Sequence, residues 1–66
     1  MISYNKLWKI LIDKGITKTQ LRIGAGFNTS TLAKLNKNEI VSLKVIVKVC
    51  KYLQCDVGDI VEINYE

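Results

Sequence analysis

The 66-residue sequence contains no proline and no histidine, and it has only two cysteines. Without histidine, the chain lacks the commonest metal ligand, the commonest general base and the Ser-His and Cys-His nucleophile pairs. Two thiols alone also fall short of the four ligands of a structural zinc site. The sequence therefore does not predict an enzyme, and it predicts neither a metal site nor a cofactor.

Long hydrophobic runs are also missing. The uninterrupted apolar runs are only a few residues long, whereas a helix needs about 20 apolar residues to span a bilayer. The N-terminus leads directly into a mixed-charge amphipathic segment, which is not the pattern of a signal peptide. We therefore expect a cytoplasmic protein with no membrane partner, in which Cys50 and Cys55 are reduced thiols packed in the core.

The composition is that of an ordinary folded protein, with 48% hydrophobic and 24% charged residues. A chain of this length supports one domain, so we expect a single domain over residues 1–66. The net charge of +4 is unevenly distributed, because all ten basic residues precede residue 55, where only two acidic residues oppose them. This part carries +8 and the last eleven residues carry −4. A basic body favours a polyanionic partner, although a solvated surface explains the charge equally well.

The middle of the chain carries strong helix-boundary signals. Thr17 and Gln20 have the spacing of a capping box, which predicts a short helix from Lys18 to Gly24 or Ala25. Gly26 follows as the expected left-handed stop. Phe27 then serves as a buried anchor of the turn.

Asn28 is the expected N-cap of the next helix, from Thr29 to Asn36. Its inner face carries Leu32 and Leu35. Its outer face is small, polar and basic, with Thr29, Ser30, Ala33, Lys34 and the following Lys37.

The flanking segments also have helical periodicity. Ser3 is the expected cap of a helix over residues 4–14 that ends at Gly15, and Ser42 caps another that ends at Leu53. Asp56 and Asp59 open a final short helix. The β-branched residues 45–49 would suit a strand, but the lysines around them fall on a helical face. We expect an all-α fold, a compact bundle of about five short helices, with a core drawn from Tyr4, Leu7, Ile10, Leu11, Leu21, Ile23, Leu32, Leu35, Leu43, Ile46, Val49, Cys50, Leu53, Val57, Ile60 and Val61.

Two short helices joined at a glycine, the second of them polar, are the parts of a helix-turn-helix. A DNA major groove of ~12 Å admits one helix whose outward side chains are short and form hydrogen bonds. Thr29 and Ser30 meet this requirement.

Residues 16–38 resemble the helix-turn-helix of the Cro and lambda-repressor-type (XRE-like) regulators. The similarity rests on a capping threonine, a leucine four residues later, a turn glycine, and a polar run ending in two leucines. These features are Thr17, Leu21, Gly26, Thr29 to Thr31, Leu32 and Leu35. The segments from Ser42 to Leu53 and from Asp56 to Val61 resemble the closing helices of the family. The resemblance implies a lambda-repressor-like DNA-binding domain with its motif at about residues 17–36.

The resemblance also implies which residues meet DNA. The start of the recognition helix and its next turn contact bases in this family, which here gives Asn28, Thr29, Ser30, Ala33 and Lys34. The start of the preceding helix and the loop after the recognition helix contact phosphates. The stem of Arg22 is expected to lie on the core with its guanidinium group toward the DNA backbone. The expected phosphate contacts are therefore Lys18, Arg22, Asn36, Lys37 and Asn38.

Three positions depart from the family pattern. Arg22 stands where a small alanine is usual, and Thr29 stands where glutamine is frequent. Gly24 lies inside a helix, where glycine costs about 1 kcal/mol relative to alanine. Lys44, Lys48 and Lys51 recur on one face of a later helix and either extend the basic surface or are only solvated.

The leading functional prediction is a sequence-specific double-stranded DNA-binding transcriptional regulator with no evident small-molecule ligand. Because one module buries little surface on DNA, we expect a homodimer on a two-fold site. The C-terminal residues 60–66 are the candidate dimer segment, or else they cover the chain's own core. The alternative is a protein-interaction module on the same fold, such as an antitoxin or an anti-repressor.

Overall fold

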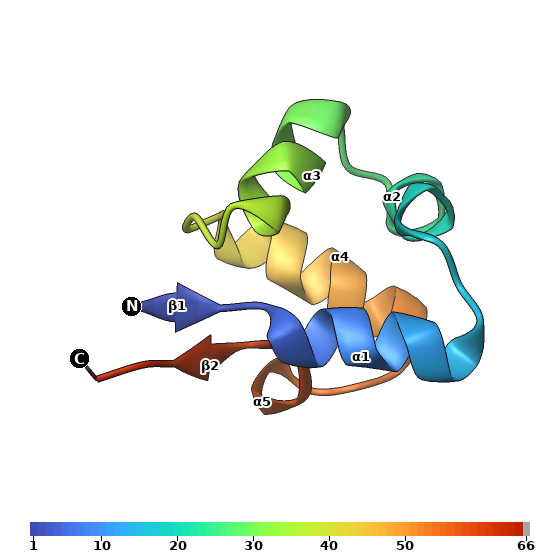
Figure 1. Ribbon diagram of the computed structural model, residues 1–66. Helices are drawn as coiled ribbons and strands as arrows, with labels where there is room; N and C mark the ends of the chain where they lie inside the picture. Colours follow the sequence, from blue (N-terminus) through green and yellow to red (C-terminus); the bar gives the residue numbers. More distant parts are fainter. Residues whose placement is uncertain (66) are drawn as a thin grey trace.

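Five helices and two short strands make up the computed structural model, which describes residues 1–65 (Figure 1). They are β1 (Ile2–Ser3), α1 (Asn5–Lys14), α2 (Lys18–Ala25), α3 (Thr29–Asn36), α4 (Leu43–Leu53), α5 (Val57–Ile60) and β2 (Glu62–Ile63). The predicted helical bundle is confirmed, with the addition of the small β-ribbon. Within the described residues, no helix has the length and apolarity needed to cross a membrane.

The helix boundaries in the middle of the chain are those that the capping residues predict. Thr17 Oγ1 accepts a hydrogen bond from the Gln20 N–H at 3.0 Å, and Gln20 Oε1 accepts one from the Thr17 N–H at 2.8 Å. Asn28 caps α3 in the same way, through the Thr31 N–H at 2.8 Å. Gly26 has φ +83° and ends α2 in the left-handed conformation that favours glycine.

The start of α1 differs from the prediction. The helix begins at Asn5, its N-cap is Tyr4, and the Ser3 hydroxyl only accepts a hydrogen bond from the Asn5 N–H at 3.2 Å. Ser3 does not cap the helix because it belongs to β1. This strand pairs antiparallel with β2, so that Ile2 lies opposite Ile63. Strands of two residues are too short to produce an alternating pattern, so the sequence did not predict them.

Most of the predicted core is buried, with three exceptions. Ile23 is 65% exposed, Leu43 68% and Val57 40%, so their assignment to the core was wrong. In α2 only Leu21 is buried, whereas Leu43 and Val57 are each the first residue of their helix, and the buried stripe of α4 begins one turn later, at Ile46. The fully packed cluster consists of Tyr4, Leu7, Leu11, Leu21, Phe27, Leu35, Ile46, Val49, Cys50, Leu53 and Ile60.

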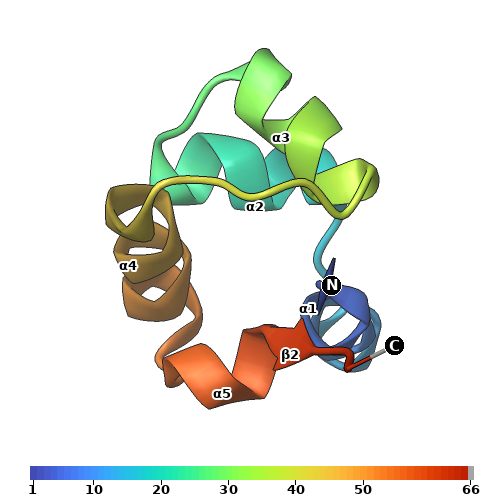
Figure 2. The same cartoon turned by 90° about the vertical axis from the view of Figure 1, so that its left-hand side faces the viewer.

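The helices surround this core as a ring. Figure 2 shows α2 and α3 at one end of the molecule, with α5 at the opposite end and α1 and α4 on the two sides. The main helix contacts are α1 with α5 and α2 with α4. The outer surface of α3 therefore stays uncovered in the monomer.

Gly24 of α2 lies against the Tyr52 side chain of α4. A Cβ atom on Gly24 would lie 2.3 Å from Cε1 of the Tyr52 ring, which no real pair of carbon atoms tolerates. The glycine therefore allows the Tyr52 ring of α4 to lie against α2. This contact explains a residue that costs about 1 kcal/mol in an isolated helix.

We predict that Gly24→Ala lowers the free energy of unfolding by about 1 kcal/mol, because the displaced Tyr52 ring costs more than the gain in helix propensity. In a Tyr52→Ala background, the same substitution should instead stabilise the protein by about 1 kcal/mol. Urea denaturation of the four proteins of this double-mutant cycle measures the difference. Equal effects in the two backgrounds would show that Tyr52 does not restrict this position.

Candidate nucleic-acid interface

The predicted base-contacting residues lie together on the uncovered side of α3. Asn28, Thr29, Ser30, Ala33 and Lys34 are all exposed. Residues 29, 30, 33 and 34 are spaced so that they share one face of a helix. The structure therefore brings the predicted set together on one surface.

The N-cap of α3 also fixes the hydrogen-bonding character of this surface. Asn28 Oδ1 accepts from the Thr31 N–H and, at 2.9 Å, from the Ser30 hydroxyl. The side-chain oxygen of Asn28 and the hydroxyl hydrogen of Ser30 therefore both take part in hydrogen bonds within the protein. Both residues are exposed, and the hydrogen-bonding capacity that these two bonds leave is the Asn28 amide N–H groups as donors and the Ser30 oxygen as an acceptor.

Lys18 joins three helices at one edge of the surface. Its Nζ donates to Asn36 Oδ1 at 2.7 Å, and the same ammonium group lies 4.2 Å from the centre of the Trp8 ring. Two predicted phosphate contacts, Lys18 at the start of α2 and Asn36 at the end of α3, are therefore neighbours. The sequence missed the part played by Trp8, because no local pattern pairs a ring on α1 with a cation on α2.

Arg22 and Lys37 lie at other positions around α3. Arg22 is in the last turn of α2 and is half-buried, which agrees with a stem that lies on the protein. Lys37 is the exposed C-cap of α3. Its backbone N–H is within 3.2 Å of the Ala33 carbonyl oxygen and 3.1 Å of the Lys34 carbonyl oxygen.

Asn38 is chiefly a structural contact. It adopts the left-handed conformation with φ +56°, and its Oδ1 accepts a hydrogen bond from the Tyr4 N–H at 3.1 Å. The hydroxyl of the fully buried Tyr4 donates to the Glu39 carbonyl oxygen at 2.7 Å. Burial raises the pKa of the Tyr4 hydroxyl, with a smaller opposing effect from the Val41 backbone, so it stays protonated and remains a donor at neutral pH. These two bonds fasten the loop after α3 to the start of α1.

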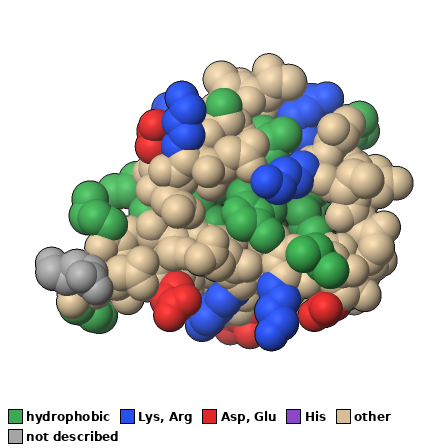
Figure 3. All heavy atoms as spheres, viewed as in Figure 1, with side chains coloured by type: hydrophobic (Ala, Val, Ile, Leu, Met, Phe, Trp, Pro, Cys, Tyr) green, Lys and Arg blue, Asp and Glu red, His purple; other side chains and the backbone are tan. Residues whose placement is uncertain are grey.

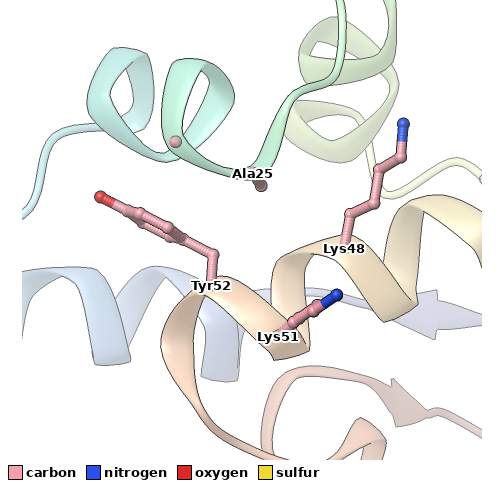
Figure 4. A pocket seen from close by; sticks show the side chains of 5 residues that line it. Ala25, Lys48, Lys51 and Tyr52 are labelled. Atoms are coloured by element: carbon pink, nitrogen blue, oxygen red, sulfur yellow. The ribbon is translucent and has the colours of Figure 1, made fainter.

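Two of the three lysines of α4, Lys48 and Lys51, line an open pocket beside the end of α2. With Gly24, Ala25 and Tyr52 they border a volume of about 280 Å³ (Figure 4). Lys48 Nζ is 3.3 Å from the Gly26 carbonyl oxygen and donates to it. Lys48 therefore supports the turn between α2 and α3 by satisfying a carbonyl group near the helix end.

The two cysteines are free thiols, as predicted. Cys50 is part of the packed core, and Cys55 packs against it. Burial raises the pKa of the Cys50 thiol to about 11, and the neighbouring Cys55 thiol adds to the shift. Cys50 is therefore protonated at neutral pH and acts as a small apolar side chain. Among the described residues, no three His, Cys, Asp or Glu side chains are grouped as a metal site.

Basic side chains lie at the end of α3, with Lys34 in its last turn and Lys37 as its C-cap. On the face that carries α1, Figure 3 shows mainly Lys and Arg side chains above an apolar centre and a mixture of basic and acidic side chains below it. A capped, exposed helix held at both ends by a preceding helix and an anchored loop is the arrangement of a helix-turn-helix DNA-binding domain.

Comparison with known proteins places the chain within this class. The model of the Cro/C1-type HTH DNA-binding domain matches residues 6–66, and the protein belongs to this family. The crystal structure of the transcriptional regulator VanUg (Form II) has a TM-score of 0.90 with this structure at 57% sequence identity. The match covers 92% of this chain and 81% of that one. No curated protein matches the chain.

We predict that Asn38→Ala lowers the free energy of unfolding by about 2 kcal/mol, because it removes the acceptor for the Tyr4 N–H and replaces asparagine, which tolerates the left-handed region, with alanine, which does so less well. Asn38→Gly should cost only about half as much, because glycine adopts the same backbone conformation freely. Asn38→Asp keeps the acceptor and serves as the control. Urea denaturation distinguishes these variants, and equal stability of all four proteins would contradict the anchoring role.

Proposed function

We propose that this protein is a sequence-specific transcriptional regulator that binds double-stranded DNA with α3 in the major groove. The whole of residues 1–66 acts as one DNA-binding domain, with the motif at about residues 17–36. The observation that carries the proposal is the exposed start of α3, where the bonds of the Asn28 cap leave the Asn28 amide N–H groups as donors and the Ser30 oxygen as an acceptor. This function requires no catalytic step.

Base recognition is assigned to the outer face of α3. Asn28, Thr29 and Ser30 form its first turn, and Ala33 and Lys34 follow one turn later. The short side chains of the first turn permit close approach to base edges, which a major-groove helix needs. Ala33 suits contact with a thymine methyl group, and Lys34 reaches the acceptor atoms of guanine.

Phosphate contacts surround this face and hold α3 in register. Lys18, Arg22, Asn36, Lys37 and Asn38 make up the set. Of these residues, Lys18 has the side chain best positioned to bind a phosphate, because Trp8 and Asn36 hold its ammonium group. It lies at the N-terminus of α2, where the helix dipole favours an anion. Asn38 contributes through its amide group, since its oxygen is bonded to the Tyr4 N–H.

The active form is proposed to be a cytoplasmic homodimer bound to a two-fold DNA site, with residues 60–66, of which Glu66 lies outside the described residues, as the contact segment. One module of this size buries too little surface for tight specific binding at physiological salt, and a dimer doubles it. The similarity to VanUg, which is described as a transcriptional regulator, supports a role in controlling transcription.

We predict that Lys37→Ala weakens binding to all duplex sequences and lowers the slope of log K against log salt by about 0.9, the value of one lost phosphate contact. Lys6→Ala removes the same charge from the end of the molecule opposite α3, where Lys6 donates to the Gly58 carbonyl oxygen, and should leave the slope unchanged (Figure 2). Fluorescence anisotropy with a labelled duplex at several salt concentrations measures both slopes. Equal slopes for the two variants would argue against the phosphate assignment.

We predict a different signature for Ser30→Ala. For a site obtained by selection from random duplexes, it should reduce the preference over unrelated DNA by about 1–3 kcal/mol, because one base contact is lost. Its salt dependence should match that of the wild type, since no phosphate contact changes. A wild-type protein that selects no sequence, or a Ser30→Ala variant with unchanged preference, would contradict base recognition by α3. A folded protein that binds no duplex even at low salt would support the protein-interaction alternative.

A further inference from the structure

Another pocket lies at the junction of α1 and α2, away from the pocket that Lys48 lines. Its volume is about 390 Å³, and it is lined by Trp8, Leu11 and Ile12 of α1, Ile16 of the connecting turn, and Thr17 and Lys18 at the start of α2. Most of these side chains are apolar. Small-molecule sites are typically hollows of about 300–1,000 Å³ with apolar walls and a few polar groups. The pocket therefore has the size and lining of a ligand site.

The described chain leaves apolar side chains of this pocket uncovered. Leu11 belongs to the core, but Trp8 and Ile16 are only half-buried and Ile12 is 78% exposed. A single exposed apolar residue is ordinary on a protein surface, whereas several around one hollow favour a binding site. Figure 3 shows apolar surface at the centre of the face that carries α1, with a basic side chain directly above it.

The walls of the pocket are fixed before any ligand binds. Gly15 ends α1 with φ +67°, and the Ile16 N–H donates to the Leu11 carbonyl oxygen at 2.9 Å. The capping box of Thr17 and Gln20 then holds the start of α2. Hydrogen bonds therefore fasten both ends of the turn between the two helices. A site that is already formed loses little conformational freedom on binding.

Two polar groups remain available at the pocket. The Lys18 ammonium group contacts the Asn36 side-chain oxygen and the Trp8 ring, and both partners are uncharged. In the part of the chain that the structure describes, its positive charge is therefore not neutralised by an acidic side chain. Thr17 Oγ1 accepts from the Gln20 N–H, but the Thr17 hydroxyl hydrogen donates to no described residue. An ammonium group and a hydroxyl donor together suit an anionic oxygen.

We propose that this pocket binds a small carboxylate with an apolar body. The carboxylate lies at the Lys18 ammonium group and the Thr17 hydroxyl, and the apolar body lies against Trp8, Ile12 and Ile16. A neutral apolar molecule would leave the positive charge unpaired, whereas inorganic phosphate would leave the apolar walls in contact with water. A ligand with both parts satisfies the whole pocket.

Lys18 connects this pocket with DNA binding, and this half of the inference rests on the proposed function. There Lys18 is a phosphate contact, and its bond to Asn36 joins the start of α2 to the end of α3. A ligand carboxylate and a DNA phosphate compete for the same ammonium group. We therefore expect the ligand to weaken DNA binding, and DNA to weaken ligand binding by the same factor.

Ligand binding is tested without DNA, with phenylacetate as the probe. Trp8 is the only tryptophan in the sequence, so its indole N–H gives a single NMR signal that reports the occupancy of the pocket. We expect this signal to shift with a dissociation constant of roughly 1 mM or below, the range for a ligand of so few atoms. Phenylacetamide has the same ring without the charge and should bind about 10-fold more weakly, because a charge-assisted hydrogen bond is lost.

Two substitutions separate the effect of the charge from that of the apolar wall. Lys18→Met should weaken phenylacetate binding about 10-fold and leave phenylacetamide binding unchanged. Lys44→Met, on α4 at the other side of the molecule, should change neither (Figure 2). Ile12→Ser should weaken the binding of both probes, because apolar contact is lost. Ile40→Ser is its matched control, since Ile40 is 74% exposed and lies outside the pocket.

Either of two results would overturn the pocket assignment. One is a Trp8 signal that does not move up to about 10 mM phenylacetate, well above the expected dissociation constant. The other is equal binding of phenylacetate and phenylacetamide that Lys18→Met leaves unchanged, as nonspecific apolar association would give.

The effect on DNA is measured separately, by fluorescence anisotropy of a labelled duplex at matched ionic strength. Saturating phenylacetate should weaken duplex binding by the wild-type protein about 10-fold and lower the slope of log K against log salt by about 0.9. It should change neither quantity for Lys18→Met. Unchanged DNA binding with an occupied pocket would contradict the competition for Lys18. If the pocket binds phenylacetate but the protein binds no duplex, the pocket assignment stands and the proposed DNA-binding function is wrong.

Discussion

The helices of this protein are too short to persist alone, and this constraint shapes the rest of the structure. They have 4 to 11 residues, below the roughly 12–15 at which isolated helices become even marginally stable in water. Each must bury one face and have the open backbone groups at its ends satisfied. Thr17, Asn28, Ser42 and Asp56 do so at the N-termini of four of the five helices. The molecule is therefore organised as much by helix ends as by its apolar cluster.

The ends of α3 are where this organisation serves recognition. Asn28 fixes the start of α3, the Lys18–Asn36 bond holds its last residue, and Asn38 ties the following loop to Tyr4. The outer face is thus held in position before any ligand arrives. A surface prepared in this way loses less conformational freedom on binding, which leaves more of the contact energy for discrimination.

How much could be predicted from the sequence depended on the separation of the interacting residues. The caps and the left-handed glycines follow from contacts within about four residues, and α2, α3 and α4 lie where those signals indicate. The exposed set on α3 was grouped correctly for the same reason. The contacts of Gly24 with Tyr52, Tyr4 with Glu39, Lys18 with Trp8 and Ile2 with Ile63 join distant segments. No periodicity reports such pairs, so the ribbon, the anchored loop and the reason for Gly24 came only from the structure.

The pairing of residue 2 with residue 63 also sets an order of events during synthesis. The capped helices take their boundary signals from neighbouring residues, but they are too short to persist alone and become stable only as they pack together. The ribbon cannot form until residue 63 has emerged from the ribosome, because Ile2 in the first strand pairs with Ile63, 61 positions later in the sequence. Contacts between such distant residues form slowly. The ribbon that ties the two ends of the chain together is therefore the last part of the fold to close.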